Sequence, residues 1–153
     1  MKYRNIESLE EFIKEVNTAL FNEDSLINFK YPSNAISPWD SVQLDLANSD
    51  TLNSLAGTAN IYAIFTAENS SDSFKLRYIG KTKKNLARQR IRNHLITKNE
   101  RTGAKLEKII SHVTSGGSVK ISWVSIEPES LRNYIEEELI NYHKGADWNR
   151  ENA

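Results

Sequence analysis

Asn60-Ile61-Tyr62-Ala63-Ile64-Phe65 and, beyond a polar loop, Phe74-Lys75-Leu76-Arg77-Tyr78-Ile79-Gly80 are the two stretches that decide the fold. The first is a short apolar run of residues that favour strands, and the second alternates between apolar and polar side chains. Because only a loop joins them, the sequence predicts two antiparallel strands, of which the second is half-buried. Gly80 ends the second strand.

The residues after this hairpin predict helices and one more strand. Apolar side chains recur at helical spacing from residue 85 to about 98, from 103 to about 114 and from 128 to 145, and residues 119–126 alternate as a strand. The order of hairpin, two helices, strand and helix predicts an α/β domain over residues 59–153. Its sheet is expected to be small, three-stranded and antiparallel, with helices flanking it.

Residues 1–58 predict a mostly helical or irregular N-terminal extension. An apolar stripe over residues 8–21 predicts an amphipathic helix that opens with a capping box at Ser8 and Glu11. Residues 26–57 read as irregular, apart from one short helix at their end. Because the extension carries 4 basic and 9 acidic side chains, we expect it to pack on the rest of the chain, to form a homodimer interface or to bind a protein partner.

The composition excludes several classes of protein. The 153 residues include no cysteine, which excludes a disulfide framework, a zinc ribbon and a thiol nucleophile. The longest apolar run, residues 61–65, is far shorter than the roughly 20 residues that a membrane helix needs. The N-terminus has no apolar signal core. We therefore expect a soluble, cytoplasmic protein with no membrane partner.

The net charge of zero hides an uneven distribution of charge. Residues 75–108 hold 12 lysines and arginines against 2 acidic residues, whereas residues 1–74 hold 4 basic and 11 acidic residues. A basic segment of this kind attracts polyanions, and its binding to a nucleic acid weakens steeply with salt. The distribution therefore favours a nucleic acid as partner.

Two tyrosines and one basic helix are the features near this segment that can carry chemistry. Tyr62 and Tyr78 lie on adjacent predicted strands, and the helix that follows carries Arg90 and His94, four residues apart and therefore on one face. The sequence contains no nucleophile elbow, no HExxH metalloprotease motif and no P-loop. The common hydrolase and nucleotide-binding constellations are thereby excluded.

These features resemble those of the GIY-YIG nucleases over about residues 60–149. The first motif of that family appears as Asn60-Ile61-Tyr62, with asparagine where glycine is usual. The second is intact as Tyr78-Ile79-Gly80, and Lys81 follows it. The closing asparagine of the family matches Asn149.

The helical motifs of the family match as well. Its catalytic arginine, with a histidine about one turn later, corresponds to Arg90 and His94, and Arg88 is the alternative arginine. Its metal-binding glutamate lies on the last helix before an apolar pair and corresponds to Glu136, with Glu137 as the alternative. The resemblance therefore implies a metal-dependent enzyme that cuts phosphodiester bonds.

The residue types suit the roles that the resemblance implies. Arg90 offers planar donors to a phosphate and is expected to stabilise the phosphoryl oxygens. Glu136 is expected to bind Mg²⁺ or Mn²⁺, with waters and the substrate phosphate as the other ligands. Tyr62 is expected to accept the proton of the attacking water, because the cations Lys81 and Arg90 would lower its pKa. Tyr78 is expected to orient water or phosphate.

The remaining candidates support the site or contact the substrate. His94 is expected to bond either to Tyr62 or to the phosphate, and the sequence does not decide between them. Gly80 and Asn149 are expected to support the active site. Four further basic residues are expected to contact nucleic-acid phosphates: Lys83, Lys84, Arg88 and Arg92.

The sequence therefore predicts a Mg²⁺-dependent endonuclease, of restriction or toxin type, that hydrolyses DNA. Double-stranded DNA is favoured because the family mostly cuts it. Two other functions stay open. One is a degenerate nuclease scaffold that binds nucleic acid without cutting it, and the other is a protein-interaction domain that uses the acidic extension.

Overall fold

The sheet has one strand more than the sequence predicts. The structure is a computed structural model that describes residues 1–97 and 105–149, and within them one antiparallel sheet has the strand order β1-β4-β2-β3. Its strands are β1 (Ile27–Phe29), β2 (Ile61–Ala67), β3 (Lys75–Lys81) and β4 (Ser118–Val124). The predicted hairpin is confirmed as β2 and β3, and the predicted later strand as β4.

The strand β1 comes from the N-terminal extension and forms one edge of the sheet. Its three residues pair with β4, and its one buried side chain, Phe29, lies opposite Val119. Three residues are too few to show an alternating pattern, which is why the sequence does not reveal this strand. The α/β class is therefore confirmed, whereas the prediction of three strands is wrong by one edge strand.

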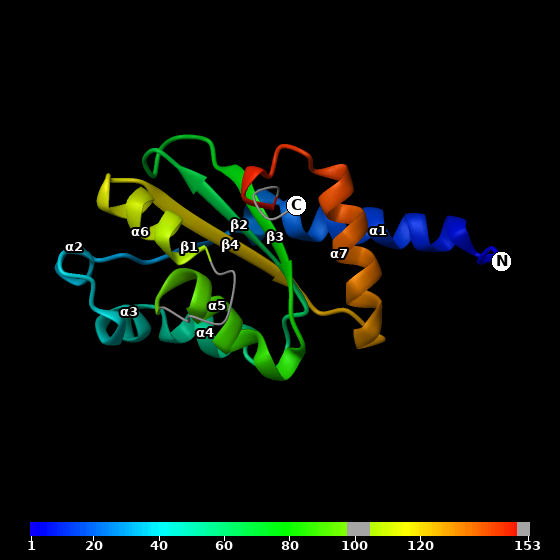
Figure 1. The fold of residues 1–153 in the computed structure, drawn as a ribbon, viewed down its shortest axis with the longest axis horizontal. Helices are drawn as coiled ribbons and strands as arrows, with labels where there is room; N and C mark the ends of the chain where they lie inside the picture. Colours follow the sequence, from blue (N-terminus) through cyan, green and yellow to red (C-terminus); the bar gives the residue numbers. More distant parts are fainter. Residues whose placement is uncertain (98–104, 150–153) are drawn as a thin grey trace.

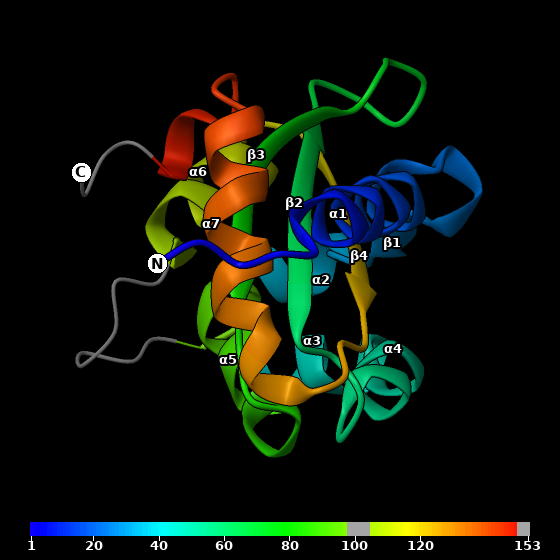
Figure 2. The same ribbon diagram turned by 90° about the vertical axis from the view of Figure 1, so that its right-hand side faces the viewer.

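Helices cover both faces of the sheet (Figure 1). On one face α1 (Ile6–Phe21) and α7 (Arg132–Tyr142) share a buried cluster with Ile61 and Ile79 of the hairpin, and Figure 2 shows these two helices in front of the sheet. The opposite face carries the other α-helices of the described residues: α2 (Ser33–Ile36), α3 (Ser41–Ala47), α4 (Ser49–Leu55), α5 (Ala87–Leu95) and α6 (Leu106–Thr114). None of the helices among the described residues is long and apolar enough to cross a membrane.

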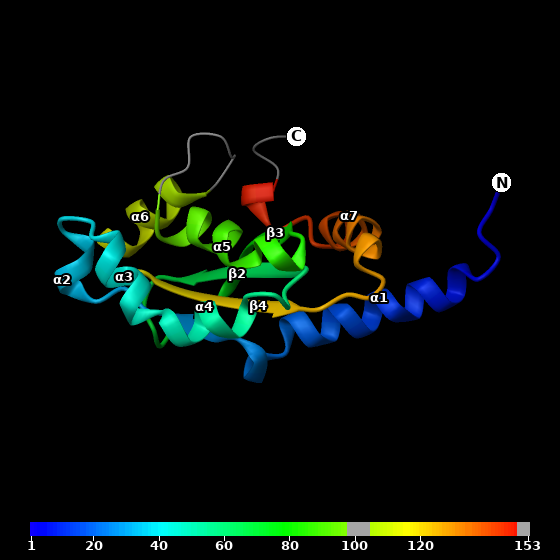
Figure 3. The same cartoon turned by 90° about the horizontal axis from the view of Figure 1, so that it is seen from below.

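The N-terminal extension is more regular than the sequence suggests. The helix predicted from residue 8 begins at Ile6, so Ser8 lies inside the helix and the predicted capping box does not form; Asn5 is the N-cap, without a side-chain bond. Residues 26–57, predicted to be irregular apart from one short helix at their end, hold β1, α2, α3 and α4, and α4 confirms that helix. The helices α2 and α3 have seven residues or fewer, too short for a periodic pattern. In Figure 3 the long helix α1 extends past the end of the sheet.

The basic helix has a tight turn before it and packs against the extension. A 3₁₀ turn at Lys84–Leu86 precedes α5. This helix was expected to continue to about residue 98, but it ends at Leu95. The expected start of the next helix at residue 103 falls outside the described residues, and α6 begins at Leu106. Backbone oxygens at the end of α5 accept hydrogen bonds from Tyr31, at 2.9 Å, and Trp39, at 2.7 Å. The extension therefore fixes the position of α5.

Candidate active site

The hairpin places Tyr62 and Tyr78 on one face of the sheet, with ring centroids 6.2 Å apart. Tyr62 lies opposite Gly80 in the strand ladder. Its ring crosses this glycine so closely that a Cβ at residue 80 would overlap the phenol. Tyr62 is 1% exposed, whereas Tyr78 is half-buried. The glycine of the second motif therefore makes room for the tyrosine of the first.

His94 completes a three-ring cluster with these tyrosines. Its ring centroid lies 5.6 Å from that of Tyr62 and 5.1 Å from that of Tyr78. The backbone N–H of Lys105 donates to Nδ1 of His94 at 3.1 Å, so Nδ1 carries no proton. The proton of the neutral imidazole is then on Nε2, which donates to the Tyr62 hydroxyl oxygen at 2.8 Å. His94 was expected to bond either to Tyr62 or to the phosphate, and in the structure it bonds to Tyr62.

The environment of His94 keeps the imidazole neutral. Burial lowers the pKa of His94 from 6.5 to about 3, and the nearby charges of Arg90 and Lys105 act in the same direction. A buried imidazolium beside two cations would be strongly unfavourable. His94 is therefore a fixed N–H donor at neutral pH.

The expectation that neighbouring cations make Tyr62 more acidic is wrong for the ligand-free protein. Burial raises the pKa of Tyr62 well above its usual 10, Tyr78 and Glu136 add to the rise, and Arg90 opposes it more weakly. Burial also raises the pKa of Tyr78, again against Arg90. Desolvation of the phenolate outweighs one exposed guanidinium. Both tyrosines therefore keep their protons at neutral pH.

Arg90 is the arginine of α5 that faces the tyrosines. Ala87, Ile91 and Leu95 are buried in the core, which leaves Arg90 exposed on the flank of the helix. Its charge acts on both tyrosines, His94 and Glu136. The alternative, Arg88, donates from Nη1 to Asn53 of α4 at 2.6 Å. Arg90 and not Arg88 therefore lies at the candidate site.

Glu136 reaches the same site from α7. Its side chain is 17% exposed, and its Oε1 lies 3.7 Å from Nζ of Lys81 at the end of β3. Burial raises the pKa of Glu136, while Lys81 and Arg90 oppose the rise. The next residue, Glu137, is exposed. The structure therefore brings Glu136, and not Glu137, toward the three-ring cluster.

A single carboxylate of this kind fits a magnesium site. No group of three or more metal-ligating side chains occurs within residues 1–97 and 105–149. Mg²⁺ commonly takes one or two carboxylates and completes its shell with water and substrate phosphate. The raised pKa of Glu136 reports a carboxylate whose desolvation the Lys81 ammonium, 3.7 Å away, does not fully offset. Glu136 is therefore suited to accept a cation together with a phosphate.

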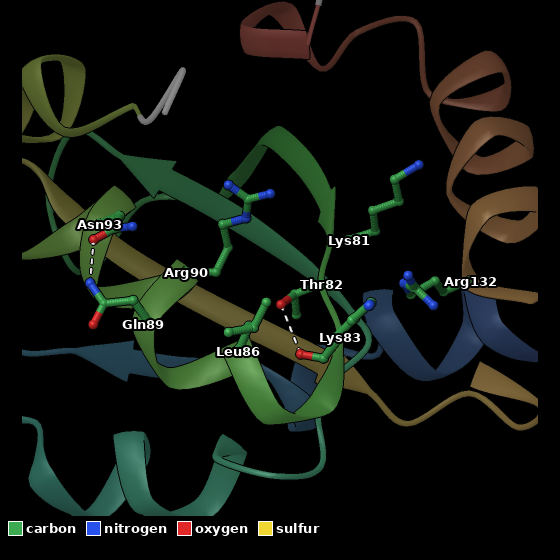
Figure 4. Close-up of a pocket in the computed structure, with 8 residues that line it drawn as sticks. All are labelled: Lys81, Thr82, Lys83, Leu86, Gln89, Arg90, Asn93 and Arg132. Carbon is green, nitrogen blue, oxygen red and sulfur yellow. Dashed lines mark hydrogen bonds between the residues drawn. The ribbon is translucent and has the colours of Figure 1, made fainter. Parts of the chain in front are cut away.

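A cationic cleft of about 370 Å³ adjoins the site. Eight residues line it: Lys81, Thr82, Lys83, Leu86, Gln89, Arg90, Asn93 and Arg132. Figure 4 shows that these side chains come from the end of β3, the turn after it, α5 and the first residue of α7. Four of the eight are cations and none is a carboxylate. Because Lys81 and Arg90 belong to both the cleft and the site, a chain of phosphates could occupy the two together.

The other predicted phosphate contacts lie outside the cationic cleft. Lys84 pairs with Glu127 at 3.1 Å. Arg92 forms a bidentate pair with Asp45 of α3, at 2.8 and 2.9 Å, and this pair ties α5 to the extension. Of the four residues predicted as further nucleic-acid contacts, Lys83, Lys84, Arg88 and Arg92, only Lys83 therefore lines the cleft.

Asn149 holds the C-terminal segment against β3. Its Oδ1 accepts from the backbone N–H of Ile79, and its Nδ2 donates to the backbone oxygen of the same residue, both at 2.8 Å. Nearby, Asp147 forms a bidentate pair with Arg77, whose guanidinium stacks over Trp148 at 4.9 Å. These contacts brace the strand that carries Tyr78.

Asn60 stands where GIY-YIG motifs usually have glycine, and its buried side chain acts as a clamp by bonding to three other residues. Its Oδ1 accepts from the N–H of Ile126 at 2.8 Å, and its Nδ2 donates to the Thr82 oxygen at 3.2 Å and to Glu129 at 3.3 Å. The same Glu129 oxygen accepts from the backbone N–H of Lys84 at 2.7 Å. One amide therefore joins the start of β2, the turn after β3 and the connection that leads into α7.

Two basic residues near the candidate site, Arg132 and Lys105, were not predicted from the sequence. Arg132 lies four residues before Glu136 on one helix face, so helical spacing could have identified it. Lys105 is buried, with its Nζ 5.6 Å from the centroid of the Tyr78 ring. No pattern in the sequence signals its position, because it depends on how the chain returns to α6.

Neither the family models, nor the curated proteins, nor the solved structures with which the chain was compared include a match.

Proposed function

We propose that the protein is a Mg²⁺- or Mn²⁺-dependent endonuclease of the GIY-YIG type that hydrolyses phosphodiester bonds in double-stranded DNA. The observation that carries the proposal is the convergence of the three-ring cluster, Arg90 and Glu136 at the cationic cleft. These groups come from two strands and two helices. Such convergence of tyrosines, a guanidinium and a carboxylate beside excess positive charge has no evident purpose in stability alone.

The groups supply what phosphodiester hydrolysis requires. Arg90 is exposed and can donate in a bidentate manner to the phosphoryl oxygens as charge develops on them. Glu136 is the residue that would hold Mg²⁺ or Mn²⁺, and the ion would supply Lewis-acid polarisation of the phosphate and stabilisation of the leaving oxygen. Lys81 lies beside Glu136 and adds positive charge at the same position.

The three-ring cluster is suited to hold and orient the attacking water. His94 donates to Tyr62 and thereby orients its hydroxyl. The ring of Tyr78 lies beside that of Tyr62, with centroids 6.2 Å apart. Tyr78 is the less buried of the two tyrosines, and its hydroxyl is the one that can meet a water molecule. A substrate phosphate and Arg90 would then share the site with that water.

A plasmid-cleavage assay tests the proposal. Wild-type protein is expected to nick or linearise supercoiled plasmid with Mg²⁺ and to lose this activity with EDTA. Glu136→Gln removes the carboxylate charge with little change of shape and is expected to abolish cleavage. Glu137→Gln is the matched control, because Glu137 is the exposed neighbour on the same helix, and it is expected to cut like wild type.

Other results would favour the alternatives. Loss of cleavage in Glu137→Gln with full cleavage by Glu136→Gln would move the metal ligand by one residue. Salt-sensitive DNA binding without cleavage under Mg²⁺ or Mn²⁺ would favour a degenerate nucleic-acid-binding module. Absence of binding at low salt would favour a protein-interaction domain. A parallel assay with RNA decides between the two nucleic acids, and partners bound through residues 1–58 stay a prediction.

A further inference from the structure

The cationic cleft extends beyond the groups that the chemistry uses. Arg90 and Lys81 border the three-ring cluster and Glu136, whereas Lys83 and Arg132 line the part of the cleft formed by the turn after β3 and the start of α7. Within residues 1–97 and 105–149, neither Lys83 nor Arg132 forms an ion pair with a carboxylate. Arg132 does donate from Nη1 to the Glu129 backbone oxygen, at 2.9 Å, which orients its guanidinium. The cleft therefore holds an excess of positive charge beyond the reacting centre.

We propose that this part of the cleft is a second phosphate subsite, in which Lys83 and Arg132 bind a phosphate that neighbours the reacting one on the same strand. The inference rests on the proposed function for the identity of the ligand as a nucleic acid. A guanidinium and an ammonium facing one opening favour a phosphodiester, because neighbouring cations repel each other until an anion neutralises them.

Leu86 indicates that the ligand is a strand and not a free anion. This leucine lines the cleft between cationic residues and is 54% exposed, so an apolar group that covers it would gain free energy by burying its surface. A phosphate ion offers no apolar surface, whereas the sugar and base attached to a phosphodiester do. The cleft volume of about 370 Å³ lies in the range of sites that hold a small organic group.

Lys84 provides a control for the loss of one positive charge. Lys84 is adjacent to Lys83 but does not line the cleft, and its Nζ pairs with Glu127 at 3.1 Å. Removing either lysine changes the net charge of the protein by the same amount. A difference between the two variants therefore reports the subsite and not the general attraction of a basic protein for DNA.

The test measures binding of the full-length protein to a labelled DNA duplex by fluorescence anisotropy, in EDTA and over a series of salt concentrations. Lys83→Gln and Arg132→Gln are each expected to weaken binding about tenfold at low salt. Each should also lower the slope of log Kd against log salt by about 0.9, the value for one lost phosphate contact. Lys84→Gln is expected to leave the slope unchanged. Equal effects of Lys83→Gln and Lys84→Gln, or unchanged slopes in both cleft variants, would overturn the subsite.

A second pair of variants tests the apolar contact. Leu86→Ala is expected to weaken binding severalfold without a change of slope, whereas Leu46→Ala, at an exposed leucine of α3 outside the cleft, is expected to change neither. Binding by Leu86→Ala at wild-type strength would overturn the strand assignment. Circular dichroism checks that each variant is folded, and because Lys83 is exposed, its variant keeps the test decisive if Arg132→Gln unfolds.

The binding assay also separates this inference from the proposed function. If the wild type binds duplex DNA with the expected slopes but does not cut plasmid with Mg²⁺, the nuclease function fails and the phosphate subsite stands. If plasmid is cut and both cleft variants bind like wild type, the subsite fails and the nuclease function stands.

Discussion

His94 donates a hydrogen bond from Nε2 to the hydroxyl oxygen of Tyr62 across 2.8 Å. The direction is fixed because the Lys105 backbone N–H already occupies Nδ1. The ring of Tyr78 lies beside that of Tyr62, with centroids 6.2 Å apart, and Tyr78 is the less buried of the two tyrosines. A neutral imidazole therefore fixes the orientation of the buried Tyr62 hydroxyl.

Removing either tyrosine hydroxyl of the three-ring cluster should slow cleavage without weakening DNA binding. We expect Tyr62→Phe and Tyr78→Phe each to reduce the rate of plasmid nicking by about 10²-fold or more, the usual effect of losing a positioned proton-transfer or orienting group. Tyr142→Phe, at a tyrosine of α7 that is 76% exposed, serves as control and should cut like wild type. A normal rate in both active-site variants would exclude the tyrosines from the chemistry.

The burial of His94 predicts a loss of stability in mild acid. Folding lowers the pKa of His94 from 6.5 to about 3, so between these values the unfolded chain binds a proton that the folded chain does not. The contribution of His94 to the free energy of unfolding therefore decreases by about 1.4 kcal/mol per pH unit as the pH falls below 6.5.

Urea unfolding at several pH values checks this contribution. His94→Gln cannot titrate but retains His143, whose pKa burial also lowers, so the difference between wild type and variant isolates His94. That difference in unfolding free energy should shift against the wild type as the pH is lowered from 7 to about 5. A difference that does not change with pH would mean that His94 is not held neutral.

The shape of the Arg90 side chain should matter as well as its charge. Arg90→Lys retains the positive charge but loses the planar set of donors, and we expect at least about a 10²-fold loss of cleavage rate. Arg88→Lys, at the arginine that donates to Asn53, should retain most of the activity. Single-turnover cleavage of a DNA duplex compares the two. The reverse result would assign the catalytic arginine to Arg88.

Asn60→Gly introduces the residue that is usual at the corresponding position of GIY-YIG motifs, and we expect it to destabilise this protein. The change removes three hydrogen bonds and leaves the buried N–H of Ile126 without its acceptor. The expected cost is about 2–4 kcal/mol in the free energy of unfolding, measured by urea denaturation. Asn69→Gly, in an exposed loop, should cost much less. Equal costs would show that the clamp contributes little.

The hairpin and the later helices could be predicted because each has enough residues to show the pattern of apolar side chains that is typical of a strand or a helix. Seven residues are enough to show the apolar run of β2 and the alternation of β3, and helices of nine or eleven residues are long enough to repeat an apolar stripe. The edge strand at Ile27–Phe29 and the two helices that follow it, α2 and α3, could not be predicted in this way. Their position depends on long-range contacts such as the bonds of Tyr31 and Trp39 to the end of α5.

The candidate site was predictable in its residues but not in its electrostatics. The resemblance to the GIY-YIG motifs identifies Tyr62, Tyr78, Arg90 and Glu136, and the structure brings them together. The direction of the Tyr62 pKa shift could not be predicted, because it depends on how completely the sheet and α5 exclude water from the phenol. The division of the basic residues between the cleft and ion pairs, as for Lys83 and Lys84, likewise depends on neighbours distant in sequence.

The contact between Asn149 and Ile79 has a consequence for self-association. The strand β3 forms a free edge of the sheet, and unpaired backbone groups at such an edge can recruit a strand from another molecule. Asn149 occupies both backbone groups of Ile79, in the middle of the segment where an added strand would pair. A side chain thus takes the place of a neighbouring strand and guards the edge that carries Tyr78 against aggregation.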